Sequence, residues 1–244
     1  MLMDVVSNRI ADLAPLVPEL LRILPSAALT CGLPQTFTST CNILRMSDMQ
    51  KQIRARALRL RRLLRKEEAL HGQIDDGAGK RYLIGPLFVQ CGDIESALTH
   101  YVWFKQNCTD ESGEPIHNLF WAVALHRAGD VSGANNKLLQ TMIQNIYLLP
   151  ILLNMQFEVR DIWHSSSREQ PDYFAEAPPE LVPTLSDKER SWITEQLESD
   201  RFRRVEAEYI STFSALKDEH SPQKRRGILD RWYEFQHLQL NIVG

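Results

Sequence analysis

A run of basic side chains between residues 45 and 66 has the clearest chemistry in the sequence. It contains nine Lys or Arg and a single Asp, so this stretch carries +8 while the rest of the chain sums to −11. Guanidinium groups neutralise phosphates or carboxylates, and a block of one sign predicts a basic surface on an otherwise acidic protein. The arginines of this candidate basic face are Arg54, Arg56, Arg59, Arg61, Arg62 and Arg65.

Several uses of this basic face stay open. Phosphate contacts along a nucleic acid would make binding fall steeply with salt. An acidic partner protein, or an acidic helix of the same chain, would use the same charges, and a run of charges is also typical of a solvated face. The stretch lacks the interleaved aromatic residues that favour single-stranded nucleic acid.

Catalytic motifs are weak throughout the chain. The sequence contains no HExxH, Walker, GxSxG or glycine-rich dinucleotide motif. Two pairs, Arg65 with His71 and Arg231 with His237, match the spacing of HEPN-type helical nucleases, in which His transfers a proton and Arg steadies a phosphate. An arginine-rich chain with seven His contains about two such pairs by chance. We therefore expect no enzyme, with a HEPN-like nuclease as the alternative.

The four cysteines indicate neither a metal site nor a disulfide. Cys31, Cys41, Cys91 and Cys108 form no CxxC pair, and no two histidines share a metal-binding spacing. The N-terminus lacks a basic start followed by an unbroken apolar run, and no stretch approaches the roughly 20 apolar residues that cross a bilayer. We expect a cytoplasmic protein without metal, cofactor or membrane contact.

The elements that must position these residues are predicted to be helices, in an all-α fold. Residues 1–41 contain two short helical patterns followed by a linker with Pro, Gly, Ser and Thr. Residues 42–70 form the longest helical pattern, which ends near Gly72, and a connector covers residues 72–79. The apolar stripe expected on the long helix consists of Leu60, Leu63, Leu64 and Leu70.

Two stretches after this connector echo one another at a constant spacing. Gly129-Asp130 follows Gly92-Asp93 by 37 residues, and a fixed period of this size is typical of stacked helix-turn-helix units. The glycine suits the left-handed conformation that ends one helix, and the aspartate can cap the next. The first stretch contains Ile84, Gly85, Phe88, Ala97 and Tyr101; the second contains Trp121, Ala122, Leu125, Ala134 and Leu138.

Residues 80–155 thereby resemble the tetratricopeptide repeat family (TPR-like), which places small residues, a turn glycine and a large residue in this order. The family's period is about 34 residues, so the three extra residues predict an enlarged loop at residues 107–115. Neither unit has the full Trp-Leu-Gly start, and we expect Pro86 to interrupt the first helix or delay it. The resemblance implies an α-solenoid whose first helices line a concave groove for a peptide or helix.

Two such units are too few to close a core, so flanking helices must cap them. Residues 148–163 are expected to form a further first helix, with Leu149, Leu152, Leu153, Phe157 and Ile162 buried. A Pro- and Ser-rich loop follows at residues 164–185. Residues 186–244 predict a C-terminal helical bundle that opens with a Ser186–Glu189 capping box. Its stripes are Phe202, Val205, Tyr209, Phe213 and Leu216, then Ile228, Leu229, Trp232, Phe235 and Leu238.

The predicted organisation has four parts: residues 1–41, 42–163, 164–185 and 186–244. The resemblance implies a non-catalytic scaffold, adaptor or chaperone that binds a peptide or helix of another protein. Alternatives are a nucleic-acid-associated regulator acting through residues 45–66 and an immunity-type inhibitor of a toxin or effector, and homo-oligomerisation is left open. The polar residues expected to line the groove are Arg81, Gln90, Asn118, His126 and Gln156.

Overall fold

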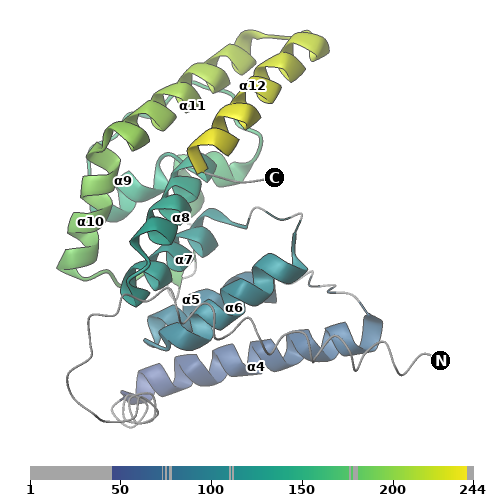
Figure 1. The fold of residues 1–244 in the computed structure, drawn as a ribbon, viewed down its shortest axis with the longest axis vertical. Coiled ribbons are helices and arrows are strands. Elements are labelled where there is room, and N and C mark those ends of the chain that lie inside the picture. The colour runs from purple at the N-terminus through teal and green to yellow at the C-terminus, as the bar shows by residue number, and fades with distance from the viewer. Residues whose placement is uncertain are drawn as a thin grey trace. The chain divides into compact units, whose positions relative to one another are not determined.

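The computed structural model describes residues 46–240, except residues 73, 75, 77, 78, 110, 112, 176 and 178–180. Throughout these residues the regular structure is helical and no strand occurs, which confirms the predicted all-α class (Figure 1). The predictions made for residues 1–45, including the N-terminal helical segment with Cys31 and Cys41, lie outside the described residues.

The long basic helix is α4 (Asp48–His71). Ser47 and Gln50 form a capping box at its start, and Gly72 ends it in the left-handed conformation (φ 67°), as its position in the sequence predicts. Leu64 is buried, but Leu63 and Leu70 are 42% and 66% exposed, so the prediction of one continuous apolar stripe was wrong for those two residues. They lie seven residues apart, on an edge of α4 that does not meet the core.

Two helical hairpins follow: α5 (Lys80–Gln90) with α6 (Ile94–Asn107), and α7 (Pro115–Ala128) with α8 (Val131–Gln144). Their turns have the predicted chemistry, because Gly92 and Gly129 take φ values of 81° and 87°. Asp93 caps α6 by accepting from the Ser96 amide at 3.2 Å, and Asp130 caps α8 by accepting from the Gly133 amide at 2.9 Å. Ala97, Ala134, Tyr101 and Leu138 are all buried.

The first hairpin depends on a close approach between α5 and α6. A Cβ placed on Gly85 would lie 2.5 Å from the Tyr101 ring, so only glycine fits there. Pro86 lies inside α5, contrary to the expected interruption, and the helix continues from Lys80 to Gln90 around it. Pro86 is buried in the core, and this packing offsets the backbone hydrogen bond that proline removes.

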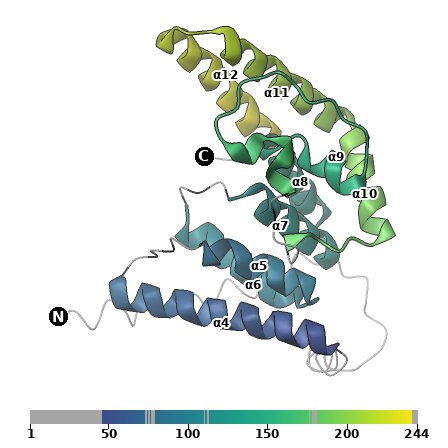
Figure 2. The same ribbon diagram turned by 180° about the vertical axis from the view of Figure 1, so that it is seen from behind.

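The hairpins share one core with the helices on either side. α4 packs along α5, α5 contacts α7, and α7 packs closely on α8, an order that can be followed in Figures 1 and 2. α7 is the most enclosed of these helices, because all ten residues from Pro115 to Ala124 are buried. A helix that is buried on every side requires neighbours on every side.

The expected helix over residues 148–163 is shorter than predicted. α9 (Leu148–Leu153) ends where Asn154 takes a left-handed φ of 56°. Leu149, Leu152 and Ile162 are buried as expected, whereas Phe157 lies exposed beyond the helix. We name residues 154–185 the connecting segment; it contains two short 3₁₀ turns, η1 (Ser167–Glu169) and η2 (Pro171–Phe174).

The C-terminal part consists of α10 (Asp187–Glu198), α11 (Asp200–Asp218) and α12 (Pro222–Leu240). The predicted capping box is present, since the Ser186 side chain and the Glu189 side chain each bind the other's backbone. The whole predicted stripe of α11 is buried, and Trp232 of α12 is buried against it, with Tyr209 and Phe213 nearby. Leu238, predicted in the stripe of α12, is instead 75% exposed, whereas Leu240 two residues later is buried.

Candidate functional site

Two predicted groove residues are bound within the protein's own structure. Arg81 pairs with Glu111 at 2.8 Å from Nη2 to Oε1, and its Nε donates to Oε2 at 3.1 Å. Asn118 is buried, and its Nδ2 donates to Oε1 of Gln144 at 2.8 Å. Gln144 in turn donates to the Gly113 carbonyl at 3.1 Å. Both predicted residues therefore hold the loop between α6 and α7.

The other three predicted groove residues lie apart from one another. Gln90 donates from Nε2 to the Val182 carbonyl at 2.6 Å. His126 stacks on Trp192 with 4.2 Å between ring centroids, and burial lowers the pKa of its imidazole. Gln156 is exposed, beyond the end of α9. The five residues do not form one surface.

The carboxyl end of α7 is covered by the chain itself. Arg127 donates from Nε to Oε1 of Glu189 at 2.6 Å, from Nη1 to the Val89 carbonyl at 3.1 Å and from Nη2 to the Thr184 carbonyl at 3.1 Å. The Glu189 side chain is 5% exposed. Burial raises the pKa of this carboxyl group, but the hydrogen bonds from Arg127 and Ser186 outweigh that effect and lower it. Glu189 therefore remains ionised and bound.

Sequence reasoning missed Arg127, although a signal for it was present. Arg127 lies 37 residues after Gln90, so the two occupy equivalent positions at the ends of α7 and α5. They bind carbonyl groups only two residues apart, those of Thr184 and Val182. The connecting segment thus crosses the ends of both first helices.

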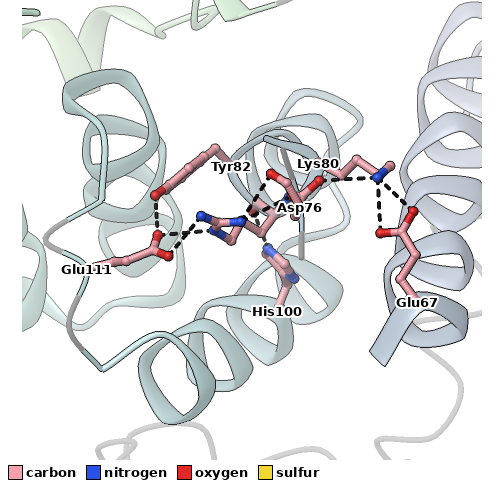
Figure 3. Close-up of polar contacts among 7 residues, drawn as sticks. Glu67, Asp76, Lys80, Tyr82, His100 and Glu111 are labelled. Carbon is pink, nitrogen blue, oxygen red and sulfur yellow. Dashed lines mark hydrogen bonds and ion pairs between the residues drawn. The ribbon is translucent and has the colours of Figure 1, made fainter. Parts of the chain in front are cut away.

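A polar network surrounds the beginning of α5 (Figure 3). Asp76 has a fully buried side chain, which accepts from the Arg81 amide at 2.7 Å and so caps an unsatisfied donor of the helix. Lys80 links this carboxylate, at 3.3 Å, to Glu67 of α4, at 2.9 Å. The hydrogen bond that Lys80 donates to Glu67 is the largest of the contacts that raise the pKa of Lys80.

The same network continues to the loop after α6. Tyr82 and Arg81 both bind the Glu111 carboxylate, while His100 bonds through Nε2 to the Arg81 carbonyl at 2.8 Å (Figure 3). Burial and the Glu111 contact raise the pKa of Tyr82 to about 12, so its phenol stays protonated at neutral pH. Each acid in the network has a basic or hydroxyl partner, so the network fastens the two connectors to α5.

Behind this network lies a histidine enclosed by aromatic rings. The His117 centroid is 4.6 Å from that of Phe104, 5.1 Å from Tyr101, 5.5 Å from Tyr82 and 6.1 Å from Trp121. Neither ring nitrogen has a hydrogen-bond partner in the described part of the chain. Complete burial holds the pKa of His117 well below its usual value, so the imidazole is neutral.

The predicted basic face divides into two parts, of which the inner part contacts the protein's own core. Arg54 pairs with Asp93, the cap of α6, at 2.8 Å from Nε to Oδ2. Arg61 places its guanidinium carbon 5.2 Å from the centroid of the Phe88 ring, and burial lowers the pKa of this group. Arg56 is half-buried and engaged by further contacts.

The outer part of α4 faces away from α5. Arg59, Arg62 and Lys66, which we name the outer cationic row, are exposed, as is Arg65 beside them. None of these four cations lies within 4.0 Å of a carboxylate of the described residues, whereas Lys51, Arg54 and Lys80 each do. Exposed Leu63 and Leu70 border the row. This face combines uncompensated positive charge with apolar side chains.

The two Arg–His pairs with nuclease spacing lie at separate places. Arg65 and His71 are exposed along and at the end of α4, and Arg231 and His237 are exposed on α12. The two pairs are on different helices with no contact between those helices among the principal packing pairs. Their exposure leaves no enclosed pocket around either imidazole.

The described residues form no candidate metal site, and both of the described cysteines are buried. No cluster of three or more His, Cys, Asp or Glu suited to a metal occurs in this part of the chain. Cys91 and Cys108 are separately buried, and burial raises the pKa of each thiol. Among the described helices, none combines the length and apolar character that crossing a membrane requires.

Comparison of the chain with protein-family models, with curated proteins and with solved structures gives no match. The fold alone defines the class of this protein, which is all-α and built around two capped helical hairpins. The tetratricopeptide resemblance stays a prediction.

Proposed function

We propose that this protein is a non-catalytic binding module that captures another protein through the outer face of α4. The observation that carries the proposal is the outer cationic row, Arg59, Arg62 and Lys66, which has no carboxylate partner among the described residues. Clustered like charges repel one another, so their placement on one exposed face favours a partner that supplies the opposite charge.

The arrangement of the hairpins supports α4, rather than a groove along α7, as the binding surface. The predicted groove residues Arg81, Gln90 and Asn118 contact the protein's own loops. The core side of α4 is packed on α5, which makes the helix a rigid platform for its exposed side. A binding module of this kind needs no catalytic residues. The polar network at the beginning of α5 consists of ion pairs within the protein.

Site-specific photocrosslinking in the native cell tests the proposal. A benzophenone side chain is introduced in place of Ala55, an exposed residue on the outer face of α4, and a control is placed at Ala207, an exposed residue of α11. We expect a protein adduct from position 55 that disappears when the outer cationic row is changed to alanine. Position 207 should give no such adduct.

Two results would contradict the proposal. One is an adduct at position 55 that persists without the outer cationic row, because the charges would then be irrelevant to capture. The other is an adduct that nuclease treatment removes, because it would identify nucleic acid as the partner and favour a regulator of the kind considered from the sequence.

A further inference from the structure

The exposed side of α4 arranges charged and apolar side chains in a regular pattern. Successive residues of an α-helix are separated by about 100° around the axis and 1.5 Å along it. Arg59 and Lys66 are seven residues apart and lie along one line, with Arg62 to one side of it. Leu63 and Leu70, also seven apart and both exposed, form a parallel line on the other side. The cations and the leucines therefore form two adjacent rows.

Contacts within the structure establish that these rows face outward. Ala57 and Leu64 are buried in the core, and Arg54 and Arg61 reach Asp93 and Phe88 on the inner edge. The rows are on the opposite side of the same helix, away from α5. From Arg59 to Leu70 they extend for about 16 Å, three turns of helix.

We infer that the partner presents an acidic amphipathic helix, which lies along α4 with carboxylates on the outer cationic row and apolar side chains on Leu63 and Leu70. This inference rests on the proposed function and names the form of the partner. Rows repeating every seven residues match another helix, because two helices that cross at a shallow angle keep such rows in register. Carboxylates at that spacing would compensate the charge that the described residues leave unpaired.

The leucines distinguish this partner from a nucleic acid. A phosphate backbone gains nothing from Leu63 or Leu70, which are 42% and 66% exposed, while an apolar helix face removes both from water. No Trp, Tyr, Phe or His lies within α4 before His71, so the helix offers no stacking platform for bases. Charge complementarity and apolar contact thus point to the same class of ligand.

Binding of a synthetic helix to the full chain tests the inference. The probe is a peptide of about 21 residues with Leu at the first and fourth positions of each heptad and Glu beside them. A scrambled peptide of the same composition and a DNA duplex of about 20 base pairs are the comparisons. We expect the periodic peptide to bind most tightly by fluorescence anisotropy, with an affinity that falls as salt is added.

Two variants separate the contributions of the rows. Changing Arg59, Arg62 and Lys66 together to alanine should weaken binding of the periodic peptide at least about tenfold, and Leu63→Ser with Leu70→Ser about fivefold. Arg231→Ala, an exposed arginine on α12, is the matched control and should leave binding unchanged. Circular dichroism checks that each variant retains its helices.

The possible failures are distinguishable. Equal binding of the periodic and scrambled peptides would overturn the helical partner while leaving capture of an acidic protein in place. Binding of neither peptide, with the adduct from position 55 retained, would do the same. Tighter binding of the duplex, with loss of that adduct on nuclease treatment, would overturn both the inference and the proposed function.

Discussion

The hairpins α5–α6 and α7–α8 repeat one turn but are enclosed by different parts of the chain. Gly92 and Gly129 share the left-handed conformation, and each is followed by an aspartate that caps the second helix. The first hairpin is enclosed by α4, whose Arg54 binds the capping Asp93. The second has the connecting segment and α10 at the end of α7, joined through Arg127. The two turns therefore have the same local hydrogen bonds, but the two hairpins depend on different distant segments of the chain for their packing.

Substitutions at equivalent positions quantify that difference. The pairs Gln90 and Arg127, His100 and Lys137, Gly85 and Ala122, and Asp93 and Asp130 are each separated by 37 residues. The two residues of each pair occupy equivalent positions in the two hairpins. A difference between the stability losses that their substitutions cause therefore reports on the different surroundings of the two hairpins. The expected effects decrease in that order.

The largest contrast is expected at the ends of α5 and α7. Arg127→Ala should lower the free energy of unfolding by about 3 to 4 kcal/mol, because it leaves the Glu189 carboxylate buried without its guanidinium. Gln90→Ala should cost about 1 kcal/mol or less, since the hydrogen bond that Gln90 donates to the Val182 carbonyl is exposed and its loss leaves no buried charge behind. Urea denaturation measures both. Equal losses would show that the connecting segment does not depend on Arg127.

The second contrast is in the response to pH at His100 and Lys137. Burial lowers the pKa of His100 to about 4, from 6.5. Below pH 6.5 the unfolded chain takes up a proton that the folded chain does not, so stability should fall as pH falls, by about 3 kcal/mol at pH 4. His117, which is also buried and neutral, should add to this loss. Denaturation curves between pH 7 and pH 4 measure it.

Lys137 should respond at the other end of the pH range. Burial lowers its pKa to about 8, from 10.5, and its ammonium lies 3.7 Å from the centroid of the Trp121 ring. Its charged form is disfavoured in the folded state, so its contribution to stability should improve as pH rises from 8 toward 10.5. His100→Gln should reduce only the acid dependence and Lys137→Met only the alkaline one. The opposite assignment would contradict both.

The third contrast concerns close packing in the first hairpin. Gly85→Ala should destabilise the protein by about 2 kcal/mol, because the new methyl group meets the buried Tyr101 ring at 2.5 Å. In a Tyr101→Leu background, which copies the Ala122 and Leu138 pairing of the second hairpin, the same alanine should cost less than about 0.5 kcal/mol. A double-mutant cycle by thermal unfolding measures this coupling, and additive effects would refute the proposed contact.

The smallest contrast is between the two capping aspartates. Asp130→Ala removes a cap and should cost about 1 kcal/mol. Asp93→Ala removes a cap and the partner of Arg54, and should cost about 1.5 kcal/mol. Arg54→Ala should reduce the difference between them. If it does not, the inner part of the basic face makes no contribution through Asp93.

The features predicted correctly from sequence depend on a few neighbouring residues. The glycine turns, the aspartate caps and the Ser186–Glu189 capping box follow from backbone geometry within one turn of helix. The buried stripe of α11 follows from helical period alone. These rules fixed the all-α class and most helix boundaries.

The misplaced features depend on contacts between distant segments. Leu63 and Leu70 satisfy an apolar pattern, yet which edge of α4 meets the core is determined by α5. Arg127 could have been paired only by knowing that Thr184 and Glu189 pass beside it, about 60 residues later in the chain. The division of the basic face into inner and outer parts has the same origin, because helix rotation is a tertiary property.

The contact between Arg127 and Glu189 has a consequence for synthesis. The two residues are 62 positions apart, so α7 leaves the ribosome well before the residue that completes its surroundings. At the usual rate of about 5–20 residues per second, Arg127 waits roughly 3 to 12 seconds for Glu189. During that interval the nascent chain displays apolar surface that the finished protein hides. The local turns form early, and the long closure makes completion of this core one of the last events of folding.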